Sequence, residues 1–262
     1  YAGFGHKQFG ELTYGNMVTI TDEVKQSDLA NTYSLTDGLL ETSARRVTQY
    51  VYNGDYGSNK VKFGAYYGGS SKRNIKNVDL KNNRKNTWGT GLIFDHEIDS
   101  IQNVTVAAGF TREISENANK TAYYSNAYAL GLAYNFVHTT YGLDFAHKDT
   151  KNKDGAGNKV KNNEVTAVIR QGLNEDWNVY AMYSYKTEKT LPVGSAYSKS
   201  TDRQFLVGTE YYVYNQGSLK VKPFLEWQAT RTKYENTFDK DSGKQLDRSR
   251  DFKTVIGLRA YW

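Results

Sequence analysis

Apolar and polar side chains alternate along this chain in segments of about ten residues, and this period of two constrains the fold more than any other feature. The stretch VTVAAGFT (104–111) puts Val, Val, Ala and Phe on one side and Thr, Ala, Gly and Thr on the other. The last residues, FKTVIGLRAYW (252–262), repeat the pattern. Successive side chains of a strand point to opposite faces, so each segment predicts a β-strand with two different faces. Helical periodicity is not sustained anywhere, and the pattern therefore predicts an all-β protein.

Counting the segments predicts about 13 strands of roughly 9–11 residues, the length that crosses a bilayer at a tilt. The links alternate between short ones, such as NED (174–176), and long polar ones, such as KDTKNKDGAGNKVKN (148–162). Short turns at one end and long loops at the other are typical of a transmembrane antiparallel β-barrel.

Strands of a β-sandwich also alternate, so the side chains on the second face must distinguish a barrel from a sandwich. One face carries Gly, Thr, Ser, Glu, Lys and Arg, and the other carries Val, Leu, Ala, Phe and Tyr. In a closed sheet of this many strands the lumen is too wide for side chains to fill, so it becomes a water channel. We therefore interpret residues 1–262 as a single barrel domain that is polar inside and apolar outside.

Composition narrows the partners and the chemistry. The chain carries 34 Lys and Arg against 28 Asp and Glu and no motif that reads nucleic acid, so we expect no nucleic-acid partner. It has no cysteine, which excludes thiolate metal sites. The histidines, His6, His96, His138 and His147, lie near turns or strand ends without a convergent nucleophile and acid. We expect no enzymatic activity, no metal and no cofactor.

The directions of the strands indicate that part of the barrel precedes Tyr1. The first short strand runs into the turn HKQ (6–8) and the last strand ends on the short-turn side, so the number of strands between them is odd. Bacterial single-chain barrels have an even number of strands. We therefore expect at least one further strand before Tyr1.

Two stretches carry a resemblance to a known family. YAGFGHKQFGELTYGNMVTI (1–20) and the closing GLRAYW (257–262) resemble the general diffusion porins of Gram-negative outer membranes, most closely the major porins of the Haemophilus and Pasteurella group. The resemblance implies 16 strands in the full protein, about 13 of them in this chain, and homotrimers of water-filled pores for small hydrophilic solutes and ions. It also implies contact with outer-membrane lipids and lipopolysaccharide. Trp262 is similar to the terminal aromatic residue of the family that signals assembly to the barrel-assembly machinery.

The longest interruption of the strand pattern, residues 15–44, is expected to be an inserted constriction loop. A loop this long in a compact protein is usually functional or disordered. In the resembled family the loop at this place folds into the barrel, and its acids face a cluster of basic residues on the wall. The stretch TDGLLE (36–41) resembles the signature of that loop and assigns Asp37 and Glu41 to the constriction.

The basic partner of these acids is expected on the strand that follows. Arg45 matches a wall arginine of the family, and strand parity with Gln49 and Asn53 favours it, although Arg46 could be the inward residue instead. Asp28 carries a weaker claim to the constriction.

Several cations are expected to line the pore, because they fall on the polar face of their strands. Each could instead pair with an acid of the same face, such as Asp144, Glu210 or Glu226. The expected pore-lining residues are Lys62, Arg170, Lys186, Lys222, Lys253 and Arg259.

An adhesin or receptor barrel is the alternative function. The loops 71–86 and 148–162 are rich in Lys and Asn and would suit an anionic glycan or lipopolysaccharide. A wide barrel without a plug still conducts, so such binding would be an added role.

Overall fold

The computed structural model describes residues 1–36, 38–71, 74–75, 78–79, 83–117, 120–153, 158–191, 197–217, 219–237 and 244–262. In these residues fourteen strands form one antiparallel sheet, and strands that follow one another in the chain are neighbours in the sheet. The strand β14 is the exception, since it continues the line of β13 along the start of β15. The strands of the sheet are β1 Ala2–His6, β2 Gly10–Val18, β3 Ser43–Tyr56, β4 Asn59–Gly68, β7 Asn83–Asp99, β8 Gln102–Asn117, β9 Lys120–Phe136, β10 Thr139–Asn152, β11 Lys159–Gly172, β12 Trp177–Leu191, β13 Tyr197–Tyr211, β14 Tyr214–Gln216, β15 Leu219–Thr237 and β16 Lys244–Tyr261.

Two small elements lie outside this sheet. The 3-10 helix η1 (Ile20–Val24) follows β2, and β5 (Asn74–Ile75) pairs with β6 (Val78–Asp79). No helix in the described part of the chain is long and apolar enough to cross a membrane.

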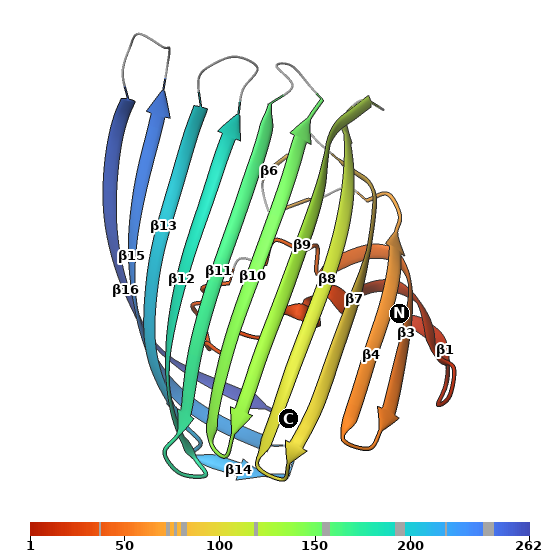
Figure 1. Ribbon diagram of the computed structural model, residues 1–262, viewed down its shortest axis with the longest axis vertical. Helices are drawn as coiled ribbons and strands as arrows, with labels where there is room; N and C mark the ends of the chain where they lie inside the picture. Colours follow the sequence, from red (N-terminus) through yellow and green to blue (C-terminus); the bar gives the residue numbers. More distant parts are fainter. Residues whose placement is uncertain are drawn as a thin grey trace.

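The sheet confirms the predicted antiparallel all-β architecture, but its strands are longer than expected. β7 has 17 residues and β15 has 19, and Figure 1 shows such strands running side by side between the two ends of the sheet. Pairing continues past the apolar part of each strand: Arg84, expected in a long loop, belongs to β7 and pairs with Ser115 of β8. Polar residues can extend a strand because its ladder of backbone hydrogen bonds is independent of side-chain polarity.

The two faces of the sheet confirm the inverted distribution of polarity. On the outer face, Leu92 is 44% exposed and Ile169 is 43% exposed, whereas Thr166 and Ser184 on the inner face are fully buried. Aromatic rings also meet on the outer face, where Phe110 lies 5.0 Å from both Trp88 and Tyr128 between ring centroids. Apolar side chains facing outward and polar side chains facing inward are what lipid outside and water inside require.

The strands β1 and β16 form the two edges of the described sheet. All five residues of β1 are exposed, and Ile256 of β16 is 81% exposed. The strands expected before Tyr1 stay a prediction.

Candidate functional site across the lumen

Residues 19–42, named here the lumen segment, leave the sheet after β2 and return to it at β3. The N–H of Thr19 donates to the carbonyl oxygen of Thr42 at 2.8 Å, and Val18 pairs with Ser43 beside them. These residues lie within the expected 15–44, and their role as a constriction loop stays a prediction. It lies on the concave side of the sheet (Figure 1).

Apolar side chains hold the first turn of the lumen segment against the wall. Ile20 and Val24 of η1 are buried together with Leu40, in one cluster with Val47 of β3 and Ile93 of β7. The burial of these apolar side chains holds the turn on the inner face without the help of a charged group.

Glycines on neighbouring strands make room for this turn. A Cβ atom at Gly131 would lie 2.1 Å from the carbonyl oxygen of Val24, and one at Gly142 would lie 2.5 Å from the carbonyl oxygen of Gln26. The inner-face glycines that approach the segment are Gly64 of β4, Gly91 of β7, Gly109 of β8, Gly131 of β9 and Gly142 of β10. These glycines were visible in the sequence as part of the polar face, but alternation alone does not reveal that another segment lies on them.

Asp144 of β10 anchors the middle of the lumen segment. Its carboxylate accepts hydrogen bonds from the N–H of Gln26 at 2.8 Å, from the N–H of Ser27 at 2.9 Å and from the Ser27 hydroxyl at 2.5 Å. Hydrogen bonds to a carboxylate are charge-assisted and therefore stronger than hydrogen bonds to a neutral acceptor. The carboxylate therefore binds backbone, rather than one of the pore-lining cations expected beside it.

Glu226 of β15 anchors the far part of the segment in the same way. Its carboxylate accepts from three consecutive N–H groups, those of Asn31 at 2.5 Å and of Thr32 and Tyr33 at 3.0 Å each. The Tyr180 hydroxyl donates to it at 2.7 Å. The segment thus reaches from β2 and β3 to the opposite wall.

A small apolar patch lies between these polar anchors, on a face that was expected to be polar. Leu35 is fully buried against side chains of β11, β12 and β13. The residues of this contact are Val168, Tyr180, Met182 and Leu206. An apolar patch is stable here because the segment covers it and excludes water from it.

Glu210 of β13 pairs with two of the expected pore-lining cations. Its carboxylate lies 2.6 Å from Lys222 Nζ and forms an ion pair with Arg170. The Asn31 side-chain amide also donates to it at 2.8 Å. For Arg170 and Lys222, the alternative of pairing with an acid of the same face is therefore the one observed.

Glu41 faces a cluster of cations that the sequence did not assign to it. Its carboxylate lies 2.9 Å from an Arg84 guanidinium nitrogen and 3.4 Å from Lys148 Nζ. Arg84 is 5% exposed and also contacts Glu113 at 3.1 Å. Arg84 and Lys148 were missed because both stand in stretches that read as long polar loops, whereas pairing extends β7 and β10 through them.

A β-bulge changes the orientation expected for Arg45. Ala44 and Val47 are three residues apart, yet both are buried in the same inner cluster. The register shifts between Gly15 and Met17 of β2, opposite Arg45 and Arg46, and Arg46 has a positive φ of 53°. An extra residue breaks the period of two, so parity with Gln49 does not reach Arg45. Both arginines are exposed, and within the described residues neither forms an ion pair with Glu41.

The other acids of the lumen segment differ in their surroundings. Asp37 lies outside the described residues. Asp28 is exposed, and its carboxylate lies 3.6 Å from Lys25 Nζ on the same segment. Glu23 contacts the wall, since its carboxylate lies 2.5 Å from Lys62 Nζ of β4. One expected pore-lining cation therefore faces the lumen segment directly.

The remaining predicted residues lie on β12 and at the C-terminal edge. Lys186 is 9% exposed and directly opposite Glu164 in the register. Lys253 is exposed and lies 3.1 Å from Asp251. Arg259 donates a hydrogen bond to the carbonyl oxygen of Asn31.

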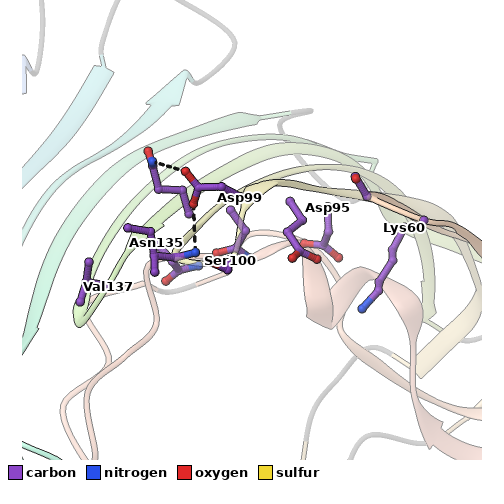
Figure 2. A pocket seen from close by; sticks show the side chains of 12 residues that line it. Lys60, Asp95, Asp99, Ser100, Asn135 and Val137 are labelled. Atoms are coloured by element: carbon purple, nitrogen blue, oxygen red, sulfur yellow. Dashed lines mark hydrogen bonds between the residues drawn. The ribbon is translucent and has the colours of Figure 1, made fainter.

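A separate pocket of about 330 Å³ lies at the short-turn end of the sheet. Figure 2 shows Lys60, Asp95 and Asp99 among the side chains that line it. Asp99 serves its own turn, because it accepts from the N–H of Ile101 at 2.9 Å and from the Gln102 amide at 2.8 Å. Among the described residues no group of His, Cys, Asp and Glu could hold a metal ion.

Comparison with known proteins relates this architecture to outer-membrane proteins. A family model described as Gram-negative porin matches residues 1–222. The major outer membrane protein of Pasteurella multocida (strain Pm70) is 22% identical over 241 residues, which cover 86% of this chain and 62% of that protein. The chain thus spans less than two thirds of the length of this relative.

Solved structures with the same architecture have low sequence identity to the chain. OmpT in its trimer form, an outer membrane protein of Vibrio cholerae, gives a TM-score of 0.64 at 14% identity, covering 97% of this chain and 77% of that one. The anion-selective porin from Comamonas acidovorans gives a TM-score of 0.62 at 15% identity, covering 97% and 75%. At these identities the likeness shows the fold, which is that of an outer-membrane β-barrel.

Proposed function

We propose that this chain, which belongs to the Gram-negative porin family, lines a water-filled channel through the outer membrane. The channel serves passive diffusion of small hydrophilic solutes and ions. The observation that carries this proposal is the lumen segment. It crosses the inside of the sheet and is tied by its backbone to Asp144 and Glu226 of the wall. A polar segment held across a wide polar lumen narrows the passage without closing it.

Charges of opposite sign meet where the lumen segment contacts the wall. Glu41 of the lumen segment faces Arg84 and Lys148 of the wall, and Glu23 faces Lys62. Charges that border a narrow water-filled pore act on every passing ion, and low-dielectric walls focus their field. We therefore assign Glu41, Arg84 and Lys148 to the constriction. Asp37 and Arg45 keep only the assignment that the family resemblance implies, and Asp28 and Arg46 keep only the weaker expectations drawn from the sequence.

Assembly is the second part of the proposal. The trimer form of the Vibrio cholerae protein supports a homotrimer for this chain. The apolar outer face supports contact with outer-membrane lipids, and the family resemblance supports contact with lipopolysaccharide. The resemblance of GLRAYW to the porin family supports recognition of Trp262 by the barrel-assembly machinery.

The two other function classes lack support. Family membership indicates a channel rather than an enzyme. The comparisons give no support to an adhesin or receptor that would use the loops 71–86 and 148–162.

Planar-bilayer recording of the purified protein tests the proposed function. We expect stepwise insertion of channels that stay open at low voltage and whose conductance rises with salt concentration. Membranes that stay non-conducting after insertion of correctly folded protein would overturn the proposal.

A further inference from the structure

A recess of about 440 Å³, named here the short-turn recess, lies between η1 and the inner face of β2, β3 and β4. Ile20 and Glu23 of η1 line one side of it. Glu11 and Lys62 line the other side, and both stand close to the short turns that join β1 to β2 and β3 to β4. The volume is within the range of about 300–1,000 Å³ that is typical of small-molecule sites.

Hydrogen bonds fix the shape of the short-turn recess. The N–H of Ile20 donates to the side-chain oxygen of Gln49 at 2.7 Å, which ties η1 to β3. The Thr13 hydroxyl donates to the carbonyl oxygen of Gln49 at 3.3 Å. Gln49 and Thr13 are both buried. The two sides of the recess are therefore held together by the protein itself, without the help of a solute.

Three charged side chains border the short-turn recess, two acids and one cation. The carboxylate of Glu23 lies 2.5 Å from Lys62 Nζ, and both side chains are partly exposed, so each can also reach a solute. Glu11 is exposed, and in the part of the chain that the structure describes its carboxylate forms no hydrogen bond or ion pair. The side chains of the recess thus carry one net negative charge.

The charged groups are separated by the length of a small molecule. Glu11 is opposite Val51 of β3, and Val51 is opposite Gly64 of β4. Lys62 lies two residues from Gly64 on the same face. Strands are about 4.8 Å apart and two residues span about 6.7 Å, so the Cα atoms of Glu11 and Lys62 are about 12 Å apart. Their side chains extend toward each other over the recess, which leaves a gap that an alkyl stem of a few carbons can bridge.

Apolar side chains lie between these charged groups. Met17 and Val51 line the recess and pack against the apolar cluster that contains Ile20. An alkyl stem can lie along such side chains while the charged groups at its ends stay hydrated. The recess therefore combines a place for a stem with two acids and one cation for its ends.

We propose that the short-turn recess binds a basic α-amino acid of the lysine class, which carries two ammonium groups and one carboxylate on an alkyl stem. The ammonium groups would pair with Glu11 and Glu23, and the carboxylate would pair with Lys62. The stem would lie on Met17 and Val51. Such a solute has one net positive charge, which balances the charge of the recess. This inference rests on the proposed channel function, to which it adds a site and a solute class.

Binding of this kind is weak, because exposed charge pairs contribute little each. A solute held so weakly exchanges rapidly. It would therefore be concentrated at the recess without blocking the channel.

The test compares three probes that differ by one charged group. Saturation-transfer NMR of the purified protein in nonionic detergent at low salt measures the dissociation constants of L-lysine, of norleucine, which lacks the second ammonium, and of cadaverine, which lacks the carboxylate. We expect L-lysine to bind the wild type about threefold to fivefold more tightly than either of the others, because one exposed charge pair contributes up to a factor of about five.

Two variants assign the charges to residues. Glu11→Gln/Glu23→Gln should weaken the binding of L-lysine by roughly tenfold, because both ammonium groups lose their partners. Lys62→Gln should remove the preference for L-lysine over cadaverine, because the carboxylate of lysine loses its partner. The matched control is Glu97→Gln/Glu175→Gln, which removes two exposed acids near the short turns but outside the recess, and it should bind L-lysine like the wild type.

Three results would each overturn the proposal. They are equal binding of L-lysine by the two double variants, equal binding of L-lysine and norleucine by the wild type, and an unchanged preference for L-lysine over cadaverine in Lys62→Gln. Bilayer recording separates this inference from the channel function. Conducting channels that do not bind L-lysine would overturn only the recess site, whereas inserted protein that binds L-lysine and does not conduct would overturn only the function.

Discussion

In Glu41, which we assign to the proposed constriction, the backbone and the side chain have separate partners. Its carbonyl oxygen accepts hydrogen bonds from the Thr21 hydroxyl at 2.7 Å and from the Tyr66 hydroxyl at 3.1 Å. Its carboxylate faces Arg84 and Lys148. The charge can therefore be removed without removing the backbone contacts that hold the residue in place.

Glu41→Gln should move ion selectivity toward anions. The change leaves Arg84 and Lys148 with Glu113 as the remaining acid of the cluster. Conductance should change by less than about twofold, because the side-chain volume is nearly kept and only the balance of charge in the pore changes. Reversal potentials under a KCl gradient measure the shift.

Asp28→Asn is the control for that measurement, since Asp28 is an exposed acid of the same segment. Its smaller effect should vanish at about 1 M salt, where the Debye length is about 3 Å. Equal shifts in reversal potential for Glu41→Gln and Asp28→Asn at low salt would show that Glu41 does not lie in the narrowest part of the pore.

Gly131→Ala should displace the lumen segment from the wall. The added Cβ would lie 2.1 Å from the carbonyl oxygen of Val24, and a backbone atom cannot turn aside as a flexible side chain can. We expect a loss of stability of about 1–3 kcal/mol, the usual cost of overpacking, together with noisier single-channel currents. Gly5→Ala is the matched control, because its nearest contact is the Glu11 side chain at 3.7 Å. Wild-type unfolding temperature and currents in Gly131→Ala would contradict the close approach.

At the scale of the element, the lumen segment is held by carboxylates of the wall rather than by regular secondary structure. Only η1, with five residues, is helical among the described residues of the segment. The N–H of Gln26 donates to Asp144, and the N–H of Asn31 donates to Glu226. These two carboxylates lie on separate strands. These two anchors fix the position of the segment along the strands and how far it extends across the lumen.

Glu226→Ala should release the far part of the lumen segment. Three backbone N–H groups and the Tyr180 hydroxyl lose their acceptor, and a hydrogen bond to a charged group contributes about 1.5–3 kcal/mol. We expect a larger and fluctuating conductance and faster proteolysis within residues 31–36. Gln228→Ala is the control on the same strand, because the Gln228 amide donates to Thr230 of its own strand. A steady conductance of wild-type size in Glu226→Ala would contradict the role of this anchor.

At the scale of the whole molecule, stability comes from paired strands and buried polar contacts instead of a conventional apolar core. Fully buried side chains include Thr87, Thr111 and Glu226, whereas the large apolar residues Leu92 and Phe205 are 44% and 42% exposed. Lipid can satisfy the outer face, and a membrane barrel pairs its backbone groups from strand to strand.

Trp262→Asp should lower assembly into the outer membrane far more than it lowers the stability of molecules already folded. Trp262 is 92% exposed, so its side chain contributes little packing within the chain. A carboxylate at the lipid-facing rim is disfavoured, and the aromatic assembly signal that we propose for this residue would be lost. The amount of protein in outer-membrane fractions, compared with the yield of refolding in detergent, measures the two effects separately. Trp262→Phe is the control that keeps an aromatic ring, and equal membrane yields for both variants would contradict the prediction.

The sequence by itself determined that the chain forms β-strands with two different faces, interrupted after β2, because alternation and its interruption are local properties of the chain. The strands extend further than this pattern predicted. It identified Glu41 through family resemblance, and Asp144, Glu210 and Glu226 as inner-face acids. Only the tertiary structure decided what these acids bind. Arg84 lies 43 residues from Glu41 in sequence and Lys148 lies 107 residues away, and no strand period encodes a contact across the lumen. The orientation of Arg45 also depended on the tertiary structure, since one extra residue in β3, opposite β2, shifts the parity from which its face was predicted.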